Sequence, residues 1–314
     1  MSSNYQYNKP QIFLSEKQNF KTFSFENFDN HYFTCIKFLK DGKLAIGSTD
    51  SSLTILTSKS FEIFLIINNT DIKNNSPYPT YITQLSDDRL IYSLSNFIMK
   101  LIKINDNKTY RVEQLLISHT NKIFKIIELM DERIASTSSD LTIKIWEKNY
   151  KNHLFEEDFH LEGEGAENII EVKNNIIAAS NSKENVIKFF DLEKKRVINT
   201  IKQINCSDNN NNLGLFKNNL LFVVGEKITV INVDTYRILY EINNKVSNNY
   251  FNSIRLLNEN SYLISNDKNV IQYGFDKKLK CNNEDVDYEK IEDIEVDIYE
   301  IVATISSKNV KLWK

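Results

Sequence analysis

The chain has 314 residues, a formal net charge of −3 and 41% apolar residues, a composition typical of globular proteins rather than disordered or fibrous ones. Its three cysteines form no CxxC pair, which indicates a reducing compartment and argues against a structural zinc site. The longest apolar runs are too short to span a bilayer, and the mild acidity gives no reason to expect nucleic acid, so we expect a cytoplasmic protein that binds neither.

The chain begins with a segment that does not share the pattern of the rest. Within it, Gln11–Phe25 contains two short apolar stretches, and the first regular unit starts near Tyr32. We therefore treat residues 1–25 as a tail that carries one strand, and residues 30–314 as the repeating part of a single domain.

From there on, short apolar or alternating runs recur with almost no sustained helical stripe, which predicts β-strands. The first set of runs is Lys43–Ser48, Arg89–Leu94, Arg133–Ser138, Asn175–Ser180, Leu220–Gly225 and Tyr262–Ser265. Each of these is followed by a short turn and a second run, and the second set has seven members: Leu53–Leu56, Ile98–Ile102, Leu141–Trp146, Val186–Phe190, Ile228–Ile231, Val270–Tyr273 and Val310–Trp313.

The second set repeats with a regular period. Its final core positions, taken as Leu56, Leu101, Trp146, Phe190, Ile231, Gly274 and Trp313, are 39 to 45 residues apart. Four short strands in a unit of this length are typical of a propeller blade. A single four-stranded sheet cannot bury both of its faces, but blades stacked around a ring can, so we predict an all-β, seven-bladed β-propeller.

One unit carries a specific motif. Residues 119–147 contain His119 before the first strand, Ser136 in the second, Asp140 in the next turn and Trp146 six residues later. This segment resembles a WD40 repeat. The resemblance implies that the four residues form a buried, structural hydrogen-bonded chain from the indole N–H through the hydroxyl and imidazole to the carboxylate, which stiffens the blade.

The other units match this motif only in part. The first keeps Asp50 but has Leu56 in place of the tryptophan, the fourth has Glu184 in place of the aspartate, and the seventh keeps Val310–Trp313. The resemblance therefore covers nearly the whole chain by period and about one blade by strict motif. In the seventh unit, Val310–Trp313 is a third strand, so we expect part of Gln11–Phe25 to pair beside it and close the ring, which removes two exposed sheet edges.

No catalytic, metal or cofactor motif stands out, and we expect a non-enzymatic chain without a cofactor. His153 and His160 have the wrong spacing for a compact zinc motif and fall on a predicted outer strand and loop. The acidic stretches Glu284–Asp287 and Glu292–Asp297 lack the residues of a calcium loop and are interpreted as solvated faces. Two alternatives stay open: a propeller-fold hydrolase or lyase, and a lipid-binding adaptor at a membrane surface.

The resemblance to WD40 propellers implies that partner peptides bind on the rim of the central channel, where the chain runs into each first strand. Tyrosine recurs there in three blades and suits a binding surface, although it could equally cover strand ends. We expect a scaffold for proteins or peptides that is monomeric by itself and works within a larger complex. The candidate rim residues are Tyr32, Thr34, Tyr78, Thr80, Lys122, Phe124, Ser139, Glu167, Tyr250 and Asn252.

Overall fold

The computed structural model describes most of the chain from the closing strand onward. The described residues are 20–24, 31–57, 60, 62–69, 76–162, 165–204, 212–216, 219–243, 251–258, 261–266, 269–274, 279–283, 291–297, 301–306 and 309–313. Within these ranges the chain forms strands and turns, without an α-helix.

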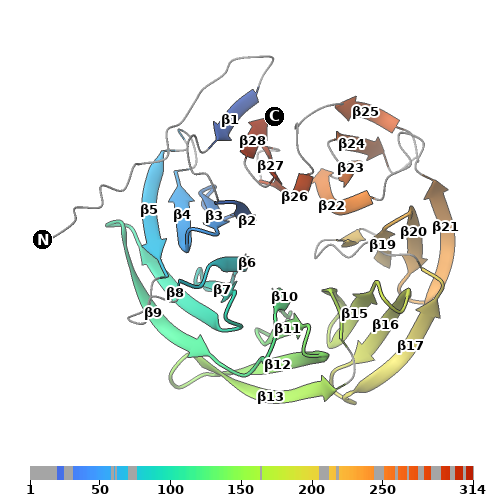
Figure 1. Cartoon of the computed structure of the whole chain (residues 1–314). Coiled ribbons are helices and arrows are strands. Elements are labelled where there is room, and N and C mark those ends of the chain that lie inside the picture. Colours follow the sequence, from blue (N-terminus) through green and yellow to red (C-terminus); the bar gives the residue numbers. More distant parts are fainter. Residues whose placement is uncertain are drawn as a thin grey trace, which may run out of the picture.

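The described strands form seven antiparallel four-stranded sheets, arranged as the blades of a ring (Figure 1). The innermost strands, which begin near the centre, are β2 (Phe33–Phe38), β6 (Pro79–Gln84), β10 (Ile123–Glu128), β14 (Asn168–Lys173), β18 (Leu213–Phe216), β22 (Phe251–Asn258) and β26 (Ile291–Val296). The second strands are β3 (Leu44–Ser48), β7 (Leu90–Leu94), β11 (Ile134–Ser138), β15 (Ile176–Asn181), β19 (Leu220–Val224), β23 (Ser261–Asn266) and β27 (Val302–Ser306).

Two further strands complete each blade toward the outside. The third strands are β4 (Ser52–Leu56), β8 (Met99–Asn105), β12 (Thr142–Asn149), β16 (Val186–Asp191), β20 (Lys227–Asn232), β24 (Asn269–Gly274) and β28 (Asn309–Trp313). The outer strands are β5 (Ile63–Asn68), β9 (Thr109–Leu116), β13 (Leu154–Glu162), β17 (Arg196–Lys202), β21 (Arg237–Asn243), β25 (Leu279–Asn283) and β1 (Phe20–Ser24). The predicted all-β, seven-bladed propeller is confirmed.

The N-terminal strand closes the ring as predicted. β1 pairs antiparallel with β28, with Phe20 opposite Trp313 and Ser24 opposite Asn309. The seventh blade therefore combines three strands from one end of the chain with one from the other. An apolar cluster that joins Ile36 of the first blade to Val310 and Leu312 of the seventh completes the closure.

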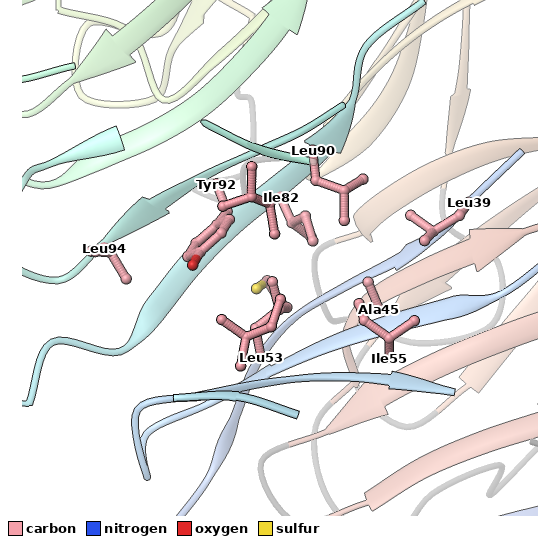
Figure 2. Close-up of a cluster of buried hydrophobic side chains, with 11 residues drawn as sticks. Leu39, Ala45, Leu53, Ile55, Ile82, Leu90, Tyr92 and Leu94 are labelled. Atoms are coloured by element: carbon pink, nitrogen blue, oxygen red, sulfur yellow. The ribbon is translucent and has the colours of Figure 1, made fainter. Parts of the chain in front are cut away.

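The core consists of apolar layers between neighbouring blades, because each sheet must bury both faces. All five residues of β3, β7, β11 and β27 are buried, and apart from Tyr92 they are apolar or small. Figure 2 shows one such layer, in which Leu53 and Ile55 of the first blade meet Ile82 and Tyr92 of the second. Gly47 belongs to the same junction, since a Cβ there would lie 2.6 Å from Cys35 Sγ and 2.9 Å from Pro79 Cβ.

A polar contact repeats between blades at the turns from first to second strand. Gln84 accepts a hydrogen bond from the backbone N–H of Lys40 in the preceding blade at 2.7 Å. Glu128 accepts one from Ser86 N at 2.6 Å, and Glu171 accepts one from Met130 N at 2.5 Å. We call Gln84, Glu128 and Glu171 the interblade acceptors, because each satisfies a backbone donor of its neighbour.

The register corrects two of the positions used to derive the period. In six blades the third and outer strands shift register at one residue, and that residue is Ile102 in the second blade and Tyr273 in the sixth. The equivalents of Trp146 are therefore Ile102 rather than Leu101, and Tyr273 rather than Gly274. Apolar patterning could not fix this, because Leu101 and Ile102 are both buried.

Candidate functional site

The four motif residues of the third blade form one hydrogen-bonded chain. Trp146 Nε1 donates to Ser136 Oγ at 3.0 Å, and Ser136 Oγ lies 2.7 Å from His119 Nε2. His119 Nδ1 lies 2.8 Å from Asp140 Oδ2. His119 lies in the segment before β10, Ser136 is in β11, Asp140 is in the following turn and Trp146 is in β12. The hydrogen bonds therefore join two strands of one sheet to the segment before β10 and to the turn after β11.

The turn after β11 positions Asp140 through its own backbone. Asp140 Oδ1 accepts from Thr142 N at 3.0 Å and from Thr142 Oγ1 at 2.6 Å, while Oδ2 accepts from Thr120 N at 3.1 Å. Leu141, between these residues, has a φ of 66°, so the carboxylate stabilises a left-handed turn residue. The turn and the segment before β10 are thereby tied together.

The protonation states of Asp140 and His119 are consistent with a structural role for the four hydrogen-bonded residues. Burial raises the pKa of Asp140, but hydrogen bonds from Thr142 and His119 outweigh it and hold the pKa at about 2. Burial lowers the pKa of His119, an effect that the bond to Asp140 only partly offsets. A neutral imidazole that donates from Nδ1 and accepts at Nε2 satisfies every partner. Because the His119 side chain has no exposed surface, this histidine is not placed to act on a substrate.

A second polar cluster lies beside this chain. Ser118 Oγ donates to Glu157, and Lys144 Nζ lies 2.7 Å from Ser118 Oγ and 3.0 Å from Glu157 Oε1. His160 Nδ1 lies 3.0 Å from the same Glu157 oxygen. Serine, lysine, glutamate and histidine are residue types that also occur together in the active sites of hydrolases. However, although burial raises the pKa of Glu157, bonds from Ser118 and Lys144 outweigh it and keep the pKa low, which makes the carboxylate a weak base.

The predicted rim residues of the first two blades lie where their inner strands begin. Tyr32 is 45% exposed, and Tyr78 and Thr80 are half-buried. Two hydroxyls are engaged within the ring: Thr34 Oγ1 donates to Pro79 O at 2.5 Å, and Thr80 Oγ1 lies 2.8 Å from Ser93 Oγ. Tyr32 therefore offers the most accessible surface of this group.

In the third blade the rim includes Lys122, Phe124 and Ser139. Lys122 is exposed, and its Nζ lies 5.4 Å from the centre of the half-buried Phe124 ring. Ser139 N donates to Lys122 O at 2.9 Å, which fixes the turn beside the start of β10. Two further apolar side chains, missed by the sequence analysis, lie on the same face: Ile117 is 68% exposed and Leu141 59% exposed.

The remaining rim candidates differ from the expectation. Glu167 is buried, and its carboxylate accepts from Ser182 N at 2.9 Å and Ser182 Oγ at 3.1 Å, so it holds the turn between β15 and β16. Asn252 is buried and donates to Ile291 O at 3.3 Å. Both side chains serve contacts within the ring. Tyr250 lies outside the described residues.

The centre of the ring holds a charged cluster that the sequence analysis missed. Arg255 Nη2 lies 3.2 Å from Asp293 Oδ1 and 3.1 Å from Glu295 Oε1, and Lys37 Nζ lies 3.0 Å from Glu295 Oε2. These residues belong to β22, β26 and β2, whose inner edges face one another around the centre (Figure 1). The expectation that Glu292–Asp297 is a solvated face is wrong for Asp293 and Glu295, because β26 is an innermost strand.

Lys125 of β10 belongs to the same charged cluster. It is 7% exposed. The charges of four residues act on its ammonium group: Arg255, Asp293, Lys37 and Glu295. Burial lowers the pKa of Lys125 to about 7, and burial raises the pKa of Asp293 to about 6. We call Lys37, Lys125, Arg255, Asp293 and Glu295 the channel cluster. The channel cluster could have been found from the sequence, because its residues occupy similar positions on the inner strands. Each lies about two or four residues after the start of its strand.

Within the described ranges, no three histidine, cysteine or acidic side chains gather in a group that could hold a metal ion. In the same ranges, no helix has the length and apolarity needed to cross a membrane.

The comparisons with known proteins inform the fold. No family model and no curated protein sequence matches the chain. Among solved structures, the chain is similar to one from a crystal structure of a mitotic checkpoint complex, with a TM-score of 0.77 and 13% sequence identity. The match covers 100% of this chain and 98% of the other. This similarity supports the propeller fold.

Proposed function

We propose that the chain is a non-catalytic WD-repeat scaffold that binds segments of partner proteins on the rim where the inner strands begin, as a subunit of a larger complex. The observation that carries the proposal is the set of exposed side chains on that face, Tyr32, Ile117, Leu141 and Lys122, held by a closed ring. Aromatic and large apolar side chains on a rigid support lose little entropy on binding. The similar solved chain comes from a multiprotein complex, which agrees with this role.

The chemistry of the polar groups supports a role without catalysis. The His119 chain is internally satisfied and buried, and the Glu157 cluster consists of groups that neutralise one another. We further propose that the chain works without a cofactor, is monomeric by itself and acts in the cytoplasm on protein rather than nucleic-acid or membrane partners.

Affinity purification with mass spectrometry tests this proposal. A tagged chain is compared with a double variant, Tyr32→Ala with Leu141→Ala, in the cells that produce it. We expect the variant to keep its Tm within about 2 °C, because neither side chain is buried, and to lose the co-purifying proteins.

The matched control is Tyr150→Ala. Tyr150 is 67% exposed, but it lies in the turn between β12 and β13, at the end of the blades opposite to the rim. It should retain every partner. Equal recovery of partners by the rim variant and the wild type would refute the rim assignment, and turnover of an ester or glycoside by the purified chain would refute the non-catalytic role.

A further inference from the structure

A groove on the outer side of the ring, between the second and third blades, carries an excess of positive charge. Its volume is about 530 Å³, and its walls include Arg89, Lys103, Arg111, Val112, Asn152 and His153. Arg89 follows the turn between β6 and β7, and His153 lies in the turn between β12 and β13. Both turns lie at the end of the blades opposite to the rim, so the groove is separate from the rim surface.

Two like charges face each other in this groove. Lys103 of β8 is the direct cross-strand partner of Arg111 of β9. Like charges directly opposite on neighbouring strands destabilise a sheet. Both residues are exposed, and Lys103 makes no ion pair with any residue that the structure describes. An anion placed between them would relieve this repulsion.

The carboxylates of the groove are already engaged. Asp87 accepts from Arg89 Nε at 3.0 Å and from Nη2 at 2.8 Å, and it lies 3.2 Å from Lys148 Nζ. Glu113 lies between Arg89 Nη1 at 3.2 Å and Arg111 Nη2 at 2.6 Å. Hydrogen bonds from Arg89 outweigh the effect of burial and hold the pKa of Asp87 at about 2, so it stays charged. The groove therefore has three cations against two carboxylates.

The floor of the groove is rigid and partly apolar. The Arg89 side chain is 5% exposed, donates from Nη1 to His153 O at 2.7 Å, and places its Cζ 5.4 Å from the centre of the Phe155 ring. Gln114 pairs through its side-chain amide with the Phe155 backbone, at 2.6 and 2.8 Å, and so ties β9 to β13.

We propose that the groove between the second and third blades binds an acidic segment of a partner protein, whose carboxylates pair with Lys103 and Arg111. The charge complementarity favours a peptide with aspartate or glutamate. Arginine matches a carboxylate with two parallel donors, and such charge-assisted bonds are stronger than neutral ones.

Selection from a phage-displayed library of random 12-residue peptides tests the proposal, with the full chain immobilised. We expect enrichment of aspartate and glutamate over the starting library. The best peptide, labelled with fluorescein, should bind in an anisotropy assay with an affinity that falls as salt rises. The Lys103→Glu and Arg111→Glu variants should each weaken it about three- to tenfold, since each replaces an attraction at an exposed site by a repulsion.

Arg237→Glu provides the matched control, because Arg237 is also an exposed arginine on an outer strand, in the fifth blade. It should leave peptide binding unchanged. Lys103→Glu replaces a like-charge pair by an opposite one, so its Tm should rise by about 1–2 °C, which separates lost binding from unfolding. The proposal is overturned by a selection without acidic enrichment, or by equal peptide affinity in the wild type and both groove variants. Neither result affects the rim, so the two proposals fail separately.

Discussion

Replacing Lys125 by methionine should flatten the pH dependence of stability and stabilise the protein at neutral pH. In the folded chain, burial lowers the pKa of this lysine from 10.5 to about 7. The unfolded chain has the ordinary value. Between these two pKa values the unfolded state therefore binds more protons than the folded state, and the free energy of unfolding rises with pH.

The size of the effect follows from the same shift. Each pKa unit corresponds to about 1.4 kcal/mol, so at pH 7 the lysine costs the folded state about 4 kcal/mol. The wild type should gain about 2 kcal/mol of stability between pH 7 and pH 9 from this residue. Lys125→Met removes the titrating group, keeps a side chain of similar length, and should lose this gain. Arg255, Asp293, Lys37 and Glu295, the charged groups around it, are left in place.

Urea denaturation at pH 7, 8 and 9 measures the difference between the two proteins. Lys122→Met is the matched control, since Lys122 precedes the same strand but is exposed; its curve should run parallel to that of the wild type. Subtracting the variant from the wild type also cancels the titration of groups that do not interact with Lys125, whereas Asp293, whose pKa Lys125 lowers, contributes least at pH 8 and 9. Parallel curves for Lys125→Met and the wild type would show that Lys125 is solvated, and the described channel cluster would be wrong.

Three further perturbations test the ring itself. Ser136→Ala removes the hydroxyl between Trp146 and His119, and leaving both partners unpaired in the core should cost about 2–4 kcal/mol in urea denaturation. Glu128→Ala removes the acceptor for Ser86 N and Ser86 Oγ and should cost about 1–2 kcal/mol; an unchanged denaturation midpoint would argue against the interblade contact. Deleting residues 1–25 exposes the edge of β28 and should lower the Tm sharply in calorimetry, whereas deleting 1–19, which keeps β1, should lower it less.

The sequence was sufficient for the fold because the repeat period and the ring closure depend on features that survive divergence. Each third strand keeps apolar residues that pack between neighbouring blades. The third-blade motif could also be predicted from the sequence, because its four residues lie within one unit at fixed spacing. The same spacing does not predict the polar contacts of the second blade. There Tyr92 occupies the register position of Ser136, and its hydroxyl donates to Asn69 Oδ1 at 2.9 Å.

The rim was predicted less well because it was assigned by a constant offset along the chain. β2, β6, β10, β22 and β26 each contain a register shift near their start, as between Ile123 and Lys125. β14 has none there, and its pairing runs without interruption from Asn168 to Glu171. The residue at the same offset therefore lies on a different side of the strand in the fourth blade. Glu167 contacts Ser182 and does not face the rim.

The channel cluster escaped the sequence analysis for a related reason. Asp293 and Glu295 alternate with Ile294 and Val296 in a way that is also typical of an exposed edge strand. In a propeller the innermost strand is an edge as well, but its edge faces other charged strands instead of bulk water. Alternation in the sequence shows which side chains point away from the apolar layer. It does not show whether those side chains contact water or other charged strands.

The absence of the complete His–Ser–Asp–Trp chain from the first and second blades raises the question of what keeps these blades rigid. The described contacts place this role between blades. Gln84 and Glu128 each satisfy a backbone donor of the preceding blade, and the apolar layers join every pair of neighbours, from the second blade around to the seventh and back to the first. In repeat proteins, stability depends on such neighbour interfaces as well as on each unit. A closed ring adds the constraint that no interface can open alone without straining the others, so the rim and the outer groove are held in fixed positions even where individual blades have lost their internal motif.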